Sequence, residues 1–216
     1  MTPHDAESEA RNAADRFRRD HRLGTQPLGD LVALIEQTTG IDVAVLDVGP
    51  DEHGLTAHDP ERERVVIGVA RTRKPVRQRG TLAHELAHVL FADWASRNGS
   101  RWSARSAAET RADAFARYLL LPVDGLREFL GSRTGITLEG LSAVVQRFLV
   151  SPAIAAIALQ QTGYISPDTK REWMAISTPS WPVVLVELSL HQQGAPAHRR
   201  PRTAVHSRCG PGGDTE

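Results

Sequence analysis

The chain has 216 residues, and its 26 basic side chains (Lys and Arg) balance its 26 acidic ones (Asp and Glu), so the formal net charge is zero. This balance excludes a bulk electrostatic attraction to nucleic acid or to a membrane surface, and no apolar run of about 18 residues could span a membrane. The single cysteine, Cys209, excludes an internal disulfide, and the polar, acidic start lacks the features of a secretion signal, so we expect a cytoplasmic protein.

The predicted elements begin with two helices and continue with short strands. Residues 6–22 form a charged, arginine-rich helix, and Pro27 opens a second helix that Gly40 ends. Three segments have the composition of strands: residues 42–47, 54–58 and 64–69. A basic connection follows the last strand, and it either meets an acidic substrate or is a solvated loop. Its basic residues are Arg71, Arg73, Lys74, Arg77 and Arg79.

A helix is predicted next, around the sequence His-Glu-Leu-Ala-His at residues 84–88. Thr81, directly after Gly80, is the predicted N-cap. The apolar positions form a stripe that would bury one side of the helix in a core. These positions are Leu82, Leu86, Val89 and Leu90.

The motif supplies metal ligands and a base. Histidines four residues apart on a helix point the same way, so His84 and His88 can bind one metal ion. Glu85 lies about 100° round the helix from His84, where it can reach a water at the metal without ligating the metal. A third protein ligand would leave the fourth position open, as in catalytic zinc sites. The alternative is a buried helix whose histidines pair with other groups, but an apolar core offers few such partners.

The third ligand is predicted on the following helix, residues 106–121, which ends before Pro122. Its Glu109 and Asp113 lie one turn apart on one face. A turn at residues 98–100 lets the two helices pack antiparallel, which would bring Glu109 to the metal and Asp113 to the free ring N–H of a ligand histidine. The alternative is a solvated acidic face beside arginines.

Asp93 is a poorer candidate ligand. It lies one and a third turns beyond His88 on what is predicted to be the same helix, where it is badly placed to complete a tetrahedron. The spacing of residues in the sequence does not identify which side chain would donate a hydrogen bond to the oxyanion formed in the reaction. The candidates are His53, His58, Arg117 and Tyr118.

The remaining pattern predicts an α+β class, with a small, mostly antiparallel sheet packed against helices. Two more helices are expected at residues 137–149 and 151–162, and a further strand at 183–190. The predicted division of the chain has four parts: a charged N-terminal helix (1–24), a zinc metallopeptidase domain (25–165), a C-terminal extension (166–190) and a disordered tail rich in Gly, Pro, Arg and Ser (191–216).

Residues 79–90 and 109–122 resemble the ImmA/IrrE family of zinc metallopeptidases, which are similar to gluzincins. The resemblance covers about residues 25–165 and implies a cytoplasmic endopeptidase with Zn²⁺ as its cofactor. It implies His84, His88 and Glu109 as zinc ligands and Glu85 as the catalytic base. It also implies a strand beside the zinc helix that binds extended substrate, and the best match for this strand is Val65, Val66, Ile67, Gly68 and Val69.

The resemblance further implies a partner. Members of the family act as anti-repressors that cleave a helix-turn-helix transcriptional repressor, so we expect a protein substrate and no direct contact with nucleic acid. Many members also carry an N-terminal DNA-binding domain or a C-terminal sensor domain. Residues 1–24 and 166–216 are too short for either, so the element that senses an inducing signal is not identified.

The alternative function is a DNA-binding or protein-binding regulatory module built on the helices at 137–162, without catalysis. Its predicted recognition helix contains no lysine or arginine, and only Gln160 and Gln161 suit base edges, which disfavours DNA binding. A zinc fold without activity is disfavoured because Glu85, which a purely structural site does not need, is present.

Overall fold

The computed structural model describes residues 3–48, 54–59, 61, 64–72, 74–93 and 106–175. The first part of the chain contains two helices and three strands: α1 (Pro3–Asp20), α2 (Leu31–Thr39), β1 (Asp42–Leu46), β2 (Gly54–Asp59) and β3 (Arg64–Ala70). The second part is helical: α3 (Pro75–Leu90), α4 (Ala107–Leu120), α5 (Val123–Leu130), α6 (Leu138–Phe148), α7 (Pro152–Gln161) and α8 (Pro167–Ala175). The predicted α+β class is confirmed.

The sheet is mixed, in the order β1-β3-β2, so the predicted mostly antiparallel arrangement is corrected. β2 pairs antiparallel with β3, with Thr56 opposite Ile67, whereas β1 pairs parallel with β3, with Val43 also opposite Ile67. The parallel pair arises because β1 skips β2, its neighbour in the chain, and joins the far edge of β3.

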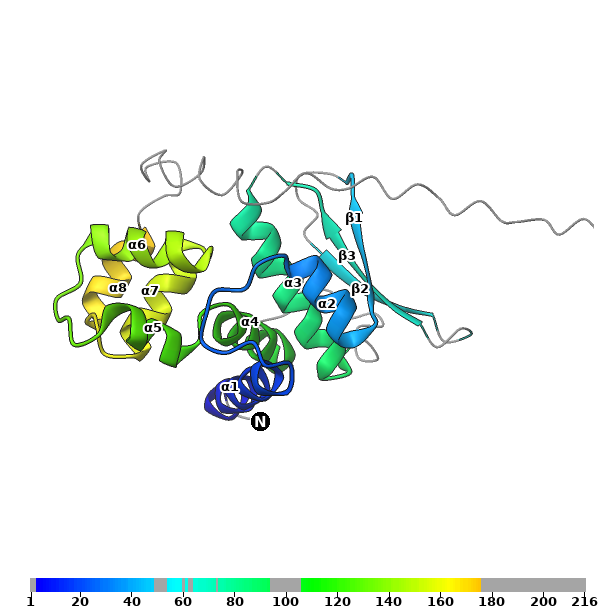
Figure 1. Cartoon of the computed structure of the whole chain (residues 1–216), viewed down its shortest axis with the longest axis horizontal. Helices are drawn as coiled ribbons and strands as arrows, with labels where there is room; N and C mark the ends of the chain where they lie inside the picture. Colours follow the sequence, from blue (N-terminus) through cyan, green and yellow to red (C-terminus); the bar gives the residue numbers. More distant parts are fainter. Residues whose placement is uncertain are drawn as a thin grey trace, which may run out of the picture.

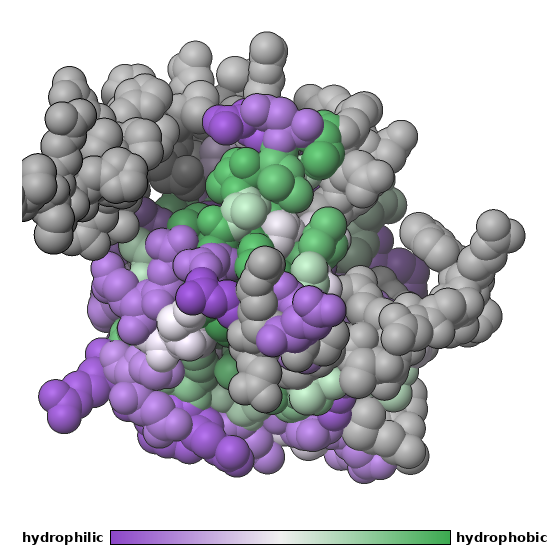
Figure 2. All heavy atoms as spheres, turned by 90° about the vertical axis from the view of Figure 1, so that its right-hand side faces the viewer, coloured by the Kyte–Doolittle hydropathy of each residue, from purple (hydrophilic) through white to green (hydrophobic). Residues whose placement is uncertain are grey.

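The central place of β3 corrects a second prediction. Val65–Val69 belong to β3, and both edges of this strand are already hydrogen-bonded, so it cannot pair with an added peptide. The edge strand in contact with α3 is β2. Figure 2 faces the side of the molecule where the sheet lies in Figure 1 and shows apolar surface there. The exposed large apolar side chains of the strands include Val45 and Leu55.

The helices pack in layers on one side of the sheet. α3 packs against β2 and β3 and, on its other side, against α4, while α1 covers α4 (Figure 1). Ile67 and Val69 of β3 and Leu86 of α3 are almost fully buried and belong to one core with Phe115 of α4. The metal-ligand candidates on α3 and α4 therefore lie on two helices whose packing is fixed by this core.

α1 is the predicted charged helix, and it is also a core element. Ala6, Ala10, Ala14 and Phe17 are buried along one face with the spacing of a helix, and the Phe17 ring meets Phe115 of α4 edge to face at 6.4 Å. Small side chains at this spacing let the two helix backbones approach closely. α1 thus packs on the helix that carries Glu109 and Asp113.

Arg18, on the same helix, forms hydrogen bonds to the chain that follows α1. Its buried guanidinium donates to the backbone carbonyls of Gly24, Gln26 and Leu119 at 2.8, 2.6 and 2.5 Å. Burial lowers the pKa of Arg18 to about 10, so the side chain stays protonated at neutral pH. The arginine therefore joins the α1–α2 connection to the C-terminal end of α4.

Several helices begin at other residues than predicted, and α1 begins at Pro3 instead of residue 6. α2 starts at Leu31 instead of Pro27, because the Asp30 side chain accepts the Ala33 N–H and caps the helix; Gly40, at φ 71°, ends it as predicted. α3 starts at Pro75, so Thr81 lies inside the helix and is not its N-cap. Proline is well suited to a first helical position, where an N–H has no partner in the helix.

The early start of α3 also changes the basic connection. Arg79 lies inside α3 and is buried, and it donates to the carbonyls of Leu28 and Gly29 at 2.7 and 2.6 Å. Arg71 is exposed and pairs with Asp47 at 2.6 Å. The segment is therefore part helix and part loop. The buried Arg79 guanidinium is engaged in hydrogen bonds to the connection between α1 and α2.

α5–α8 gather at the other end of the molecule from the sheet (Figure 1). α6 and α7 match the predicted helices at 137–149 and 151–162, whereas α5 and α8 were not predicted. α8 packs on α7 and buries Trp173. The predicted strand at 183–190 and the tail at 191–216 lie outside the described residues.

Within the described residues no single helix is long and apolar enough to cross a membrane. α6 and α7 satisfy the length and composition requirements only as a pair, and this pair is bent by 110°.

Candidate metal centre

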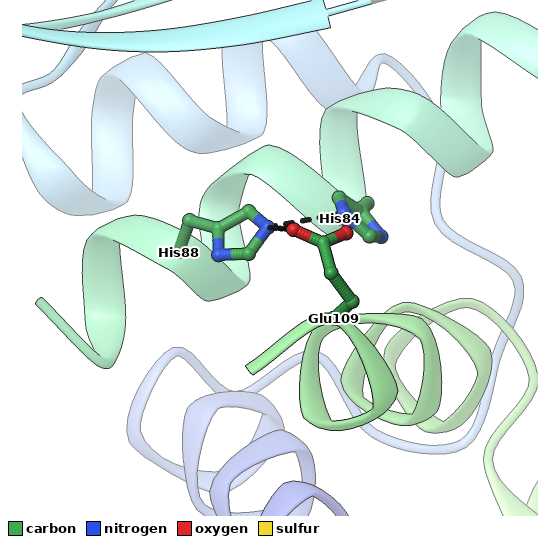
Figure 3. Close-up of side chains that lie close together, drawn as sticks. All are labelled: His84, His88 and Glu109. Atoms are coloured by element: carbon green, nitrogen blue, oxygen red, sulfur yellow. Dashed lines mark hydrogen bonds and ion pairs between the residues drawn. The ribbon is translucent and has the colours of Figure 1, made fainter. Parts of the chain in front are cut away.

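Three side chains from α3 and α4 converge at the packed face of the two helices (Figure 3). The Nε2 atoms of His84 and His88 lie 3.1 Å apart. The Glu109 carboxylate faces both, with one oxygen 3.2 Å from the His84 Nε2 and the other 3.4 Å from the His88 Nε2. These three residues form the group that could hold a metal ion.

The spacing of these atoms fits a zinc ion. Bonds of about 2.0–2.1 Å to nitrogen or oxygen in a tetrahedron place the donor atoms about 3.3 Å from one another. The two Nε2 atoms, 3.1 Å apart, lie close to that spacing, and each has one of the two Glu109 oxygens at 3.2 or 3.4 Å. Two imidazoles and one carboxylate are also a donor set found in catalytic zinc sites, where a fourth position stays open.

Glu109 reaches the group from the first turn of α4. Ser106 caps this helix by accepting the Glu109 N–H at 3.2 Å, and a glutamate at this position often reaches back to the N-cap backbone. Here its carboxylate faces the two histidines of α3 instead (Figure 3). A negative charge at a helix N-terminus is favoured by the helix dipole.

His84 is oriented by Asp113, one turn further along α4. The His84 Nδ1 lies 3.0 Å from the Asp113 carboxylate, which is the contact predicted for Asp113. With the proton on Nδ1, the Nε2 lone pair is left for a metal. Burial lowers the pKa of His84, but the hydrogen bond and charge of Asp113, with the charges of Glu109 and Glu85, outweigh it and raise the pKa overall.

His88 is almost fully buried, and its neighbour is a residue whose role the sequence did not indicate. The His88 Nδ1 lies 3.4 Å from a carboxylate oxygen of Asp93, and the other oxygen of Asp93 accepts from Arg111 at 2.7 Å. Asp93 thus lies on the Nδ1 side of His88, whereas the group of three candidate ligands lies on the Nε2 side. No local sequence pattern indicates this position, because it depends on the turn after α3.

Glu85 points toward the sheet. Its side chain is buried, and its carboxylate accepts the Thr56 hydroxyl of β2 at 2.8 Å. A Cβ at Gly54, two residues earlier on β2, would lie 2.4 Å from the Thr81 side chain and 3.0 Å from that of Glu85. The absence of a side chain at Gly54 therefore lets the edge strand approach α3 closely enough for Thr56 to reach Glu85.

A family model described as the IrrE N-terminal-like domain, of a peptidase family, matches residues 36–160, which is more than half of the chain. The chain belongs to this family. The match confirms the family resemblance stated above and lies within the predicted domain of residues 25–165. No curated protein matches the chain.

Among solved structures, a Mycobacterium tuberculosis transcriptional regulator is similar, with 22% sequence identity and a TM-score of 0.50. The similarity covers 74% of this chain and 52% of that chain, so this chain spans about half of the length of the regulator. At this identity the likeness shows the fold alone.

The other candidate residues of the IrrE-like domain lie elsewhere. Arg117 and Tyr118 both donate to Glu7 of α1, away from the two histidines, so neither is placed to stabilise an oxyanion. His58 lies on β2, two residues after Thr56 and on the same face of the strand. His53 lies outside the described residues, as does the predicted turn at 98–100.

The helices of the alternative DNA-binding function are core elements. α6 and α7 cross at 110°, an angle found in helix-turn-helix motifs. However, α7 buries Ala155, Ala156, Ala158 and Leu159, and its exposed side chains are only Ala153 and Gln161. A recognition helix must present several polar side chains to a groove, so this geometry gives the alternative no support.

Proposed function

We propose that this chain is a zinc-dependent endopeptidase in which His84, His88 and Glu109 hold the metal and Glu85 is the general base. The observation that supports the proposal most strongly is the convergence of two Nε2 atoms and one carboxylate within reach of a single metal ion, together with a buried glutamate next to His84 in the chain. A solely structural site would gain nothing from Glu85.

Zinc bound by this group would lower the pKa of a water molecule and polarise the scissile carbonyl of a peptide. Glu85 would take the proton of that water and pass it to the leaving amine. The Thr56 hydroxyl donates to one carboxylate oxygen of Glu85 and holds this side chain in one orientation. Asp113 keeps the His84 proton on Nδ1, so that Nε2 remains a ligand.

The substrate backbone is expected to bind along β2. Among the described strands, β2 pairs only with β3, so its other edge is open to an extended peptide. Because Thr56 of β2 contacts Glu85, a peptide on this edge would pass beside the base and the metal ligands. β2 is therefore the proposed substrate-binding strand, in place of Val65–Val69.

We propose a helix-turn-helix transcriptional repressor as the substrate, which would make the chain an anti-repressor. The support is the family resemblance of residues 79–90 and 109–122 and the open strand edge, which suits an unfolded or extended segment of a protein. Direct binding of nucleic acid has no support from the charge balance or from the exposed face of α7.

The test is cleavage by the purified, zinc-loaded protein of two substrates: an unstructured test protein and a helix-turn-helix repressor encoded near its gene. The wild type is compared with Glu85→Gln and with Glu172→Gln, a matched change on the exposed surface of α8. We expect Glu85→Gln to lose about 10²–10⁴-fold in rate, and Glu172→Gln to retain the wild-type rate. Equal cleavage by Glu85→Gln and the wild type would refute the proposed base.

Cleavage of the unstructured protein but not of the repressor would leave the peptidase proposal in place and reject the proposed substrate. Mass spectrometry of the fragments identifies the cleaved bond in either case.

A further inference from the structure

We propose that Asp93 is a positioning residue for the metal ligand His88, and that Arg111 and Glu9 hold Asp93 in place from α4 and α1. The inference rests on the proposed metal site and extends it. It concerns a carboxylate that neither the motif nor the family resemblance assigns.

The turn that ends α3 directs Asp93 back toward His88. Phe91 donates its N–H to the Ala87 carbonyl at 2.9 Å, and Ala92 donates to Val89 at 3.0 Å, which closes the last turn of the helix. Ala92 has φ 54°, a left-handed conformation that is unfavourable for a residue with a Cβ and that glycine usually occupies. The chain reverses at this alanine, so Asp93 leaves the helix axis and faces the ligand helix again.

The side chains that meet there are largely shielded from water. His88, Asp93 and Arg111 have 1%, 12% and 13% of their side-chain surface exposed. Asp93 places one carboxylate oxygen 3.4 Å from the His88 Nδ1, the ring nitrogen opposite the one that faces Glu109. The two atoms are at ion-pair distance and outside hydrogen-bond geometry. A carboxylate in this place would favour the proton on Nδ1, orient the ring and make Nε2 a stronger donor to a metal.

The charge of Asp93 needs a partner, because a carboxylate with little exposure is costly when it is alone. Arg111 supplies it at 2.7 Å, and the guanidinium also lies over the Phe91 ring, 4.2 Å from its centre. The other end of Arg111 pairs with Glu9 of α1 at 2.8 Å. A chain of contacts thus runs from α1 through Arg111 and Asp93 to His88.

Each ligand histidine therefore has a carboxylate behind it, in a different setting. Asp113, behind His84, has 49% of its side-chain surface exposed, whereas Asp93 has 12%. Water can replace an exposed hydrogen-bond partner more easily than a buried one. We therefore expect the loss of Asp93 to weaken metal binding more than the loss of Asp113.

The test is the affinity of the full-length, metal-free protein for Co²⁺ and Zn²⁺, measured by titration against a chelator with the cobalt absorption spectrum as readout. Asp93→Asn should bind about 10–100-fold more weakly and change the cobalt spectrum, and Asp113→Asn should have a smaller effect. Asp15→Asn, in an exposed pair with Arg11, is the matched control and should bind as the wild type does.

A second variant guards against misfolding. Arg111→Gln retains Asp93 but removes its counter-charge, so it should also weaken binding, and Glu9→Gln, at the exposed end of the same contacts, should weaken it by a smaller factor. Wild-type affinity in both Asp93→Asn and Arg111→Gln would overturn the inference. A wild-type protein that binds neither ion would instead contradict the proposed function, so the two failures are distinguishable.

Discussion

Two polar clusters lie along α4, one near each end of the helix, and they differ in their balance of charge. The metal cluster lies at its first two turns and consists of His84, His88, Glu109 and Asp113. The closed cluster lies near its other end and consists of Glu7, Arg117, Tyr118 and Gln161.

The closed cluster contains its own cation and donors. Arg117 and Tyr118 of α4 and Gln161 of α7 all donate to the Glu7 carboxylate, the last two at 2.8 and 2.9 Å. The metal cluster brings two carboxylates against two imidazoles and has no arginine or lysine among its members. A cluster that contains its own cation stabilises a fold, whereas an acceptor-rich cluster of histidines and carboxylates can hold a metal ion. This difference assigns structure to one end of α4 and chemistry to the other.

The largest expected effect is the response of stability to zinc. A ligand that binds only the folded state at about 100 times its Kd stabilises that state by about 2.7 kcal/mol. Zinc should therefore raise the melting temperature of the wild type and of Glu7→Gln, but not that of His88→Ala. Thermal unfolding with and without zinc measures this. An equal rise in His88→Ala would place the bound metal outside the metal cluster.

The next effect concerns the closed cluster. Glu7→Gln removes the charge that Arg117 faces and should lower the free energy of unfolding by about 1–2 kcal/mol, a value reduced because Glu7 is partly exposed. Zinc affinity should not change. Denaturant unfolding and a zinc titration check the two expectations, and a weakened zinc affinity would show that the clusters are not independent.

The pH dependence of the same variant gives a smaller, graded effect. Burial raises the pKa of Glu7, but the hydrogen bond and charge of Arg117 and the hydrogen bonds of Tyr118 and Gln161 outweigh it, so the pKa lies below the ordinary value of 4.5. A lowered folded-state pKa stabilises the protein fully above 4.5, and this contribution is lost as the pH falls through the folded-state pKa. The difference in unfolding free energy between wild type and Glu7→Gln should therefore shrink at acidic pH. A difference that stays constant below pH 4.5 would contradict this account.

The smallest effect is expected when the hydrogen bond between Thr56 and Glu85, the proposed base, is removed. Thr56→Val keeps the shape of the side chain but removes the hydroxyl that Glu85 accepts, and one hydrogen bond contributes about 0.5–1.5 kcal/mol. The turnover number should fall by about 2–10-fold, with zinc content unchanged, and Thr56→Ser should restore it. Loss of zinc in Thr56→Val would mean that the strand supports the metal cluster itself.

Local patterns in the sequence were sufficient for the residues that share one helix face. The helical period places His84 and His88 together and Glu109 above Asp113, so their mutual geometry could be predicted once the helices were recognised. The end of α2 at Gly40 could also be predicted from the local sequence, since glycine readily adopts the left-handed conformation.

Features that depend on distant pairings could not be predicted in this way. β3 is central because β1 pairs with it and not with β2, its neighbour in the chain. The composition of the strands does not indicate that order. Asp93 reaches His88 only because an alanine adopts a positive φ, a conformation that sequence rules do not assign to it. Thr56 meets Glu85 because Gly54 allows the strand to approach, and a glycine there could equally have marked a turn.

The central claim is that the metal cluster holds one zinc ion. The most direct measurement is the metal content of the purified protein by mass spectrometry, for the wild type, Glu109→Ala and Glu7→Gln. We expect about one zinc ion per chain in the wild type and in Glu7→Gln, and little or none in Glu109→Ala. A wild-type protein without metal that takes up none when zinc is added would contradict the assignment of chemistry to this end of α4.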